Sequence, residues 1–265
     1  MATNHTTSIA IKHGVNTQGF FSFEQPENLI VFVHGFGGNA ISTWNNFSSS
    51  LIFDDHFKKS DIIFYGYNTF KGSANDHATQ LYHFLNLAVN PLLSDVLPMQ
   101  QKLPDRNYQR IVFVAHSLGA VLVRQAQLLA EIAQKDWVNK SSLALFAPAH
   151  NGVEVIALAM QTLPGLSSLL GIFARLKYPI LNDLDVEKGG ILKDIRDKTK
   201  ELQDKGKADF AKARLVVHAM GDKIIIGNQY LLDNPAEIIE NSTHTAVCKP
   251  NDKYLTPFEL IKKII

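Results

Sequence analysis

One serine in this chain is placed where it could act as a nucleophile. Ser117 lies in the run Ala115-His116-Ser117-Leu118-Gly119, with a small residue two positions before it and two positions after it. A serine hydroxyl is a weak nucleophile near pH 7, so it needs an imidazole to take its proton and a carboxylate to orient that imidazole. A set of this kind transfers acyl groups through a covalent intermediate.

Two elements have to position this serine. Ile111 to Val114 form a short apolar run that is typical of a parallel strand buried on both faces, and Leu118 to Ala133 consist mostly of helix-forming residues. Ser117 therefore falls on a tight turn from strand to helix, which is the arrangement of a nucleophile elbow. The first turn of that helix directs its N–H groups toward the serine, so an anion that forms on the attacked carbonyl would meet a positive dipole end.

A second motif lies upstream of the serine. Leu29 to Val33 form another apolar run, which ends in the sequence His-Gly-Phe-Gly-Gly at residues 34–38. Together the two motifs resemble those of the α/β-hydrolase superfamily, in its lipase and esterase branch, and the resemblance covers nearly the whole chain. The sequence departs from the usual Gly-x-Ser-x-Gly pattern at Ala115. The alternative is that Ala115 to Gly119 are only the small-residue start of a helix.

This resemblance implies the α/β-hydrolase fold, with a mostly parallel central sheet, helices on both faces and a helical cap insertion. Further strand-like runs at 61–67, 141–148 and 214–219 are interleaved with helical patterns, which is the rhythm of βαβ units. We expect one of these helices from about His77 to Val89, and a last helix opened by a capping box of Thr256 and Glu259. With 265 residues the chain is expected to be a single domain over residues 1–265, with the cap at about 152–210.

The resemblance also implies partners for the serine. In this fold the chain order is Ser, Asp, His, and Ser117, Asp222 and His244 match that order. Asp222 follows a strand and a glycine, where the acid of these hydrolases lies, and His244 lies in a late polar loop. The backbone N–H groups of Phe36 and Leu118 would bind the oxyanion.

Other residues compete for these roles. Asp233 and Glu240 also lie between the serine and His244, so either could be the acid in place of Asp222. Three histidines are weaker candidates for the base, because one lies beside the serine, one follows the sixth strand and one lies inside a strand: His116, His150 and His218. The sequence has no metal-binding spacing such as His-Glu-x-x-His, and the chemistry requires no metal and no cofactor.

The stretch from Val155 to Ala174 contains no charged residue and is long enough for a helix that crosses a bilayer. A single span would separate Ser117 from His244, and Pro164-Gly165 divide the stretch in the middle. We therefore expect no transmembrane segment, but a cap of two short helices over 153–176.

Met160 and Phe173 lie on the apolar faces of this cap and are expected to line an acyl pocket over the serine. The alternative is that these faces pack on the body of the protein or on a second subunit, which would give a homodimer through the cap. The sequence thus predicts a serine hydrolase that cleaves carboxylic esters of an acyl or lipid-like small molecule through an acyl-enzyme. A thioesterase or amidase, and a noncatalytic small-molecule receptor or scaffold with this fold, are the alternatives.

The overall composition limits the partners and the compartment. Lys and Arg number 26 against 25 Asp and Glu, and a net charge of +1 gives no field toward nucleic acid or an anionic membrane. Cys248 is the single cysteine, which excludes an intrachain disulfide, and residues 1–7 lack the basic and apolar regions of a signal peptide. We therefore expect no nucleic-acid partner and a cytoplasmic location. Export by a route that reads no N-terminal signal would leave the same sequence.

Overall fold

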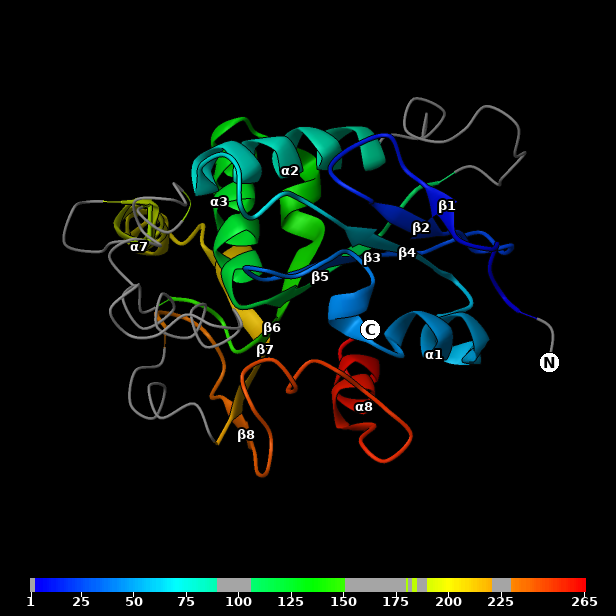
Figure 1. Ribbon diagram of the computed structural model, residues 1–265. Helices are drawn as coiled ribbons and strands as arrows, with labels where there is room; N and C mark the ends of the chain where they lie inside the picture. Colours follow the sequence, from blue (N-terminus) through cyan, green and yellow to red (C-terminus); the bar gives the residue numbers. More distant parts are fainter. Residues whose placement is uncertain (1–2, 90–105, 151–179, 181–182, 185–189, 221–229) are drawn as a thin grey trace.

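The computed structural model describes residues 3–89, 106–150, 180, 183–184, 190–220 and 230–265. In these residues the chain forms an eight-stranded sheet with the strand order β1-β2-β4-β3-β5-β6-β7-β8 (Figure 1). β1 pairs antiparallel with β2, β2 pairs antiparallel with β4, and the remaining neighbours pair parallel. The strands are β1 (Ile9–Ala10), β2 (Gln18–Phe20), β3 (Asn28–Val33), β4 (Ser60–Tyr65), β5 (Arg110–His116), β6 (Ser141–Phe146), β7 (Ala213–Ala219) and β8 (Glu237–Ile239).

Helices cover both faces of this sheet, which confirms the mostly parallel, two-faced arrangement expected from the sequence. Because successive side chains of a strand point to opposite faces, the central strands bury Val31 and Phe113 in one core and Phe32 and Val114 in the other. On the first face lie α2 (Ala74–Ala88), α3 (Leu118–Ile132) and α7 (Ile191–Asp204), and on the second lie α1 (Phe47–Phe53) and α8 (Thr256–Lys262) (Figure 1).

The ends of two helices differ from the sequence-based expectation. α2 begins at Ala74, where Ser73 and Asp76 form a capping box, each side chain accepting a hydrogen bond from the backbone N–H of the other. In α8 the expected capping box is wrong, because Thr256 is already helical and Leu255 is the N-cap, with no side-chain cap bond. Because Thr256 has helical dihedral angles, its hydroxyl is not at the N-cap position, from which a side chain accepts from the N–H groups of the first turn.

The predicted cap at about 152–210, including Met160 and Phe173, lies largely outside the described residues. Within its last part, α7 is an amphipathic helix that buries Leu192 and Ile195 against the first core. Among the helices that the structure describes, none combines the length and the apolar character needed to span a membrane.

Candidate active site

The backbone dihedral angles of Ser117 are neither those of the strand before it nor those of the helix after it. The residue lies between β5 and α3 with φ 51° and ψ −119°, a conformation that costs free energy for a residue with a side chain. Its N–H donates to the Phe146 carbonyl at 3.0 Å, which ties the turn to the neighbouring strand β6. The turn therefore holds the hydroxyl at the carboxyl ends of the parallel strands, the edge where ligands bind in sheets of this kind.

The small residues around Ser117 allow this turn to pack against β3. A Cβ atom at position 119 would lie 2.2 Å from the Val33 carbonyl oxygen and 2.6 Å from that of His34, so only glycine fits there. Ala115, in contrast, pairs with Val33 and Leu145 inside the sheet and is fully buried in the core. The departure from the usual pattern at Ala115 is accommodated because its methyl group fills core space and leaves the turn free.

The structure brings His244 to the serine. His244 Nε2 lies 3.0 Å from Ser117 Oγ, although the two residues are 127 positions apart, and the imidazole is only 8% exposed. At this distance the hydroxyl can donate its hydrogen to a neutral imidazole, which is the geometry of a nucleophile with its general base.

The loop that carries His244 is anchored on the second face of the sheet. Val247 and Cys248 are fully buried there beside α1 and α8, and Asn45 Nδ2 donates to the Pro250 carbonyl at 2.8 Å. Burial raises the pKa of the Cys248 thiol to about 12, so this residue is a buried apolar contact and remains a thiol.

The His-Gly loop is held by a neutral histidine. The His34 ring stacks on Tyr67 with centroids 4.3 Å apart, accepts a hydrogen bond from Tyr67 N–H at Nε2 (3.3 Å) and donates from Nδ1 to the Gly35 carbonyl (2.9 Å). Burial lowers the pKa of His34 to about 4, so both bonds persist near neutral pH. Gly37 N–H donates to Thr69 Oγ1 at 3.1 Å, which fixes the tip of the loop to the segment after β4.

This loop lies directly against the elbow. A Cβ atom on Gly35 would lie 2.8 Å from Ser117 Cβ, so the backbone that leads to Phe36 passes beside this serine. Leu118, the first residue of α3, is adjacent to the serine in the chain. Leu118 thus follows Ser117 in the chain and Phe36 follows Gly35, which lies against it, and the role of the Phe36 and Leu118 N–H groups as oxyanion donors stays a prediction. On the outer side, Phe70 meets Phe36 edge-on with centroids 5.5 Å apart and is 43% exposed.

One rival acid and one rival base are held by the same arginine. Asp233 accepts from Arg124 Nη2 with both carboxylate oxygens, at 2.7 and 2.6 Å, and also from the Ala213 N–H. His150 Nε2 accepts from Arg124 Nε at 2.9 Å, and burial together with the Arg124 charge lowers the pKa of His150 well below its usual value. Asp233 and His150 are therefore committed to a buried ion-pair cluster that supports α3.

The remaining candidates have simpler outcomes. Glu240 is exposed and directly follows β8. Asp222 lies outside the described residues, so the role of Asp222 as the acid stays a prediction.

The sequence analysis did not identify Arg124 as the centre of a cluster. Its signal was a charged residue in the middle of a helix whose neighbours are apolar, because a charge buried in such a helix needs a partner.

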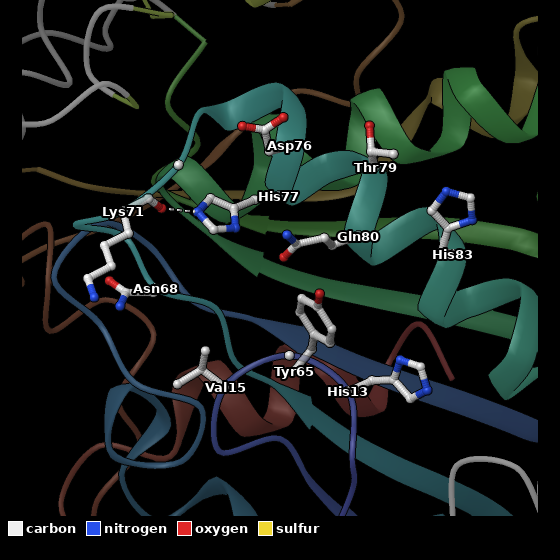
Figure 2. A pocket seen from close by; sticks show the side chains of 12 residues that line it. His13, Val15, Tyr65, Asn68, Lys71, Asp76, His77, Thr79, Gln80 and His83 are labelled. Atoms are coloured by element: carbon white, nitrogen blue, oxygen red, sulfur yellow. Dashed lines mark hydrogen bonds between the residues drawn. The ribbon is translucent and has the colours of Figure 1, made fainter.

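A separate cavity of about 730 Å³ opens beside the carboxyl end of β4, under α2 (Figure 2). Figure 2 shows His77 turned toward the backbone oxygen of Lys71, to which its Nε2 donates at 2.6 Å. The His77 ring also contacts Tyr67, with centroids 5.1 Å apart, and Tyr67 stacks on His34. His77 lines the cavity and is connected through Tyr67 to His34 of the His-Gly loop, whereas Ser117 is not among the lining residues described. No group of three or more His, Cys, Asp or Glu side chains is placed to hold a metal ion in the part of the chain that the structure describes.

Solved structures share this fold. The mature lipase BlEst2 of Bacillus licheniformis is 16% identical, with a TM-score of 0.56 over 92% of this chain and 97% of that one. The peroxisomal α/β-hydrolase Lpx1 of Saccharomyces cerevisiae is 10% identical, with a TM-score of 0.54 over 99% and 88%. Esterase B from Lactobacillus rhamnosis is 11% identical, with a TM-score of 0.52 over 98% and 86%. At such identities the similarity establishes the fold, which is that of the α/β-hydrolases.

Sequence comparison gives the family. No curated protein matches the chain. The family model described as "Putative serine esterase (DUF676)" matches residues 24–184, which is more than half of the chain and includes β3, the His-Gly loop and the elbow. The chain therefore belongs to the DUF676 serine esterase family and has the α/β-hydrolase fold of lipases and esterases.

Proposed function

We propose that this protein hydrolyses carboxylic esters through an acyl-enzyme intermediate. Ser117 is the nucleophile, His244 the general base and Asp222 the carboxylate that orients His244. The observation that carries the proposal is the 3.0 Å contact between His244 Nε2 and Ser117 Oγ at a serine held at φ 51° and ψ −119°. A buried serine–imidazole contact on a strained strand-to-helix turn is what nucleophilic catalysis by serine requires.

The reaction then proceeds in two halves. Ser117 Oγ attacks the ester carbonyl carbon while His244 Nε2 takes the hydroxyl proton, and the carbonyl oxygen becomes an oxyanion beside the N–H groups of Phe36 and Leu118. The C–O bond to the alcohol breaks as His244 returns the proton to the leaving oxygen. Water then attacks the acyl-enzyme by the same route and releases the carboxylic acid and free Ser117.

An apolar acyl group fits the surroundings of the His-Gly loop. Phe36 and Phe70 form an edge-to-face pair on the outer side of that loop, and Phe70 exposes 43% of its surface. The predicted cap, with Met160 and Phe173 on its apolar faces, would add further apolar lining over the serine. The substrate class that we propose is therefore an acyl or lipid-like ester.

Replacement of the nucleophile tests this proposal. Ser117→Ala is expected to lower the turnover of short p-nitrophenyl esters by about a factor of a million and to abolish labelling by a fluorophosphonate probe, because no other hydroxyl replaces the nucleophile. Ser142→Ala, at a buried serine in β6, is the matched control and should keep both activities. Turnover by Ser117→Ala within tenfold of the parent, or a parent protein with neither turnover nor labelling, would rule out the proposal. The second result would favour a noncatalytic receptor.

A further inference from the structure

His116, the last residue of β5, makes a contact that the mechanism above does not use. Its side chain is 6% exposed, and its Nε2 lies 2.8 Å from the backbone carbonyl oxygen of His244. Since a carbonyl oxygen only accepts hydrogen bonds, Nε2 carries the hydrogen, and the neutral ring then has its lone pair on Nδ1. Nδ1 is buried and has no partner among the described residues. The ring is thus held by its bond to His244.

The hydrogen bond from His116 to the His244 carbonyl closes a ring of contacts that includes Ser117 Oγ and His244 Nε2. His116 and Ser117 are joined by a peptide bond, Ser117 Oγ contacts His244 Nε2 at 3.0 Å, and the His244 carbonyl returns to His116 at 2.8 Å. The nucleophile and the base come from segments more than a hundred residues apart, yet one side chain next to the nucleophile fixes the backbone of the base. A loss of this bond would let the His244 loop shift without disturbing the elbow.

A neutral His116 suits a position beside His244, the base that becomes protonated in the proposed reaction. The rings of His116 and His244 have centroids 5.0 Å apart, so a second positive charge on His116 would repel the imidazolium that forms in the reaction. Burial, together with the neighbouring His244, Lys249 and His34, lowers the pKa of His116 to about 3, although the bond to the His244 carbonyl acts in the opposite direction. His116 therefore stays neutral at ordinary working pH and donates one hydrogen bond without adding charge.

We infer that His116 is a positioning residue that holds the backbone of His244 so that its imidazole reaches Ser117 Oγ. This inference rests on the proposed function, because it assigns His116 a role in presenting the base of that reaction. Its specific requirement is an N–H at the position of Nε2. A glutamine amide nitrogen falls near that position, whereas an asparagine amide nitrogen falls near the position of Nδ1 and cannot reach the carbonyl.

The chain offers a matched control in His5. His5 is 1% exposed, its Nε2 lies 2.8 Å from the Ser60 carbonyl oxygen, and its Nδ1 is likewise buried without a partner among the described residues. Ser60 is the first residue of β4, whereas Ser117 follows the last residue of β5, so in these parallel strands His5 lies at the opposite edge of the sheet. His5 thus has the burial and bonding of His116 but lies far from the reacting atoms.

The experiment compares His116→Gln, His116→Asn, His5→Gln and His5→Asn in the full chain. We expect His116→Asn to lower kcat for a short p-nitrophenyl ester by about 10- to 100-fold with little change in KM, the scale of a displacement of about 1 Å at the base. His116→Gln should recover kcat to within about threefold of the parent, because it restores the N–H at the same place. Fluorophosphonate labelling should slow by the same factor as kcat. Both His5 variants should keep the parent kcat per folded molecule, even where their thermal midpoints fall.

The pH profile gives a second measurement. Since His116 does not titrate near neutral pH, the acid limb of kcat/KM should fit a single proton and have the same midpoint in His116→Gln as in the parent. A midpoint shift in His116→Gln would mean that His116 titrates with the base, and would overturn the inference.

The remaining outcomes separate this inference from the proposed function. Equal kcat values in His116→Asn and His116→Gln, or an equal loss in His5→Asn, would reduce His116 to a structural residue. If His116→Asn does not fold, His116→Met provides the donor-free comparison. A parent protein that is labelled at Ser117 while every His116 variant keeps full kcat would overturn only the inference. A parent protein without labelling or turnover would overturn both.

Discussion

At the residue scale, the backbone of Gly35 lies so close to the elbow that it leaves no room for a side chain. Gly35→Ala would place a methyl carbon 2.8 Å from Ser117 Cβ and 2.9 Å from His116 Nδ1, so the loop or the serine must move. We expect kcat/KM for p-nitrophenyl acetate to fall by about 100-fold while the fold is kept. Gly206→Ala is the control, because a Cβ there meets nothing within 4 Å at φ +67°. It should cost about 1 kcal/mol of stability and no activity. A Gly35→Ala enzyme with parent activity would contradict the close contact.

The two aspartates near the end of the chain should separate catalysis from stability. Asp222→Asn is expected to lower kcat by about 10⁴, the scale for losing imidazole orientation. Asp233→Asn should leave the kcat of folded protein unchanged but lower the free energy of unfolding by about 3–5 kcal/mol, because Arg124 loses a buried bidentate partner. The test measures kcat and the free energy of unfolding in urea for both variants. Equal, small effects on kcat would leave Glu240 or another group as the acid.

At the element scale, strands and helices were the most predictable part of the molecule. The apolar runs that became β3 and β5 and the small residues around Ser117 are local signals, and they gave the elbow and the His-Gly loop. The α8 capping box failed because the pattern of Thr256 and Glu259 cannot show which residue takes the first helical dihedral angles. The bonds from Arg124 to Asp233 and from His116 to His244 join side chains or backbones 109 and 128 positions apart. No local pattern carries such pairings.

The predicted cap provides a test of substrate preference. If its apolar faces and the Phe36–Phe70 pair enclose the acyl group, each buried methylene should contribute up to about 0.8 kcal/mol, so kcat/KM should rise severalfold from acetyl to butyryl or hexanoyl esters. Met160→Gln, Phe173→Gln and Phe70→Gln should each flatten this rise and spare acetyl-ester turnover. The measurement is a chain-length series on the parent and the three variants. A flat series in the parent would remove the lipid-like substrate from the proposed function.

At the scale of the whole molecule, buried neutral histidines make stability depend on pH. Burial lowers the pKa from an ordinary 6.5 to about 4 for His34 and about 3 for His116. Below pH 6.5 these two histidines bind protons in the unfolded chain but stay neutral in the folded chain. The free energy of unfolding therefore falls as the pH decreases toward these pKa values, by up to about 1.4 kcal/mol per pH unit for each histidine. Urea unfolding at pH 6.5 and 4.5 should show this decrease, and His116→Gln should lose less stability over the same interval. Equal slopes in parent and variant would contradict a neutral, buried His116.

The anchoring of the His244 loop also determines when the site can exist during folding. Residues 43–45 and 248–250 meet across a separation of 205 positions, and Phe258 of α8 packs on Phe47 and Phe57. Contacts between residues so distant in sequence form late in folding. Closing such a long loop costs chain entropy, which must be offset by packing that is already in place. The described strands, the elbow and the His-Gly loop all precede His244 in the chain, so a growing polypeptide contains the proposed nucleophile before it contains the proposed base. If Ser117 and His244 have the proposed roles, the serine is present but inactive during synthesis, and hydrolysis would begin only when the last loop docks.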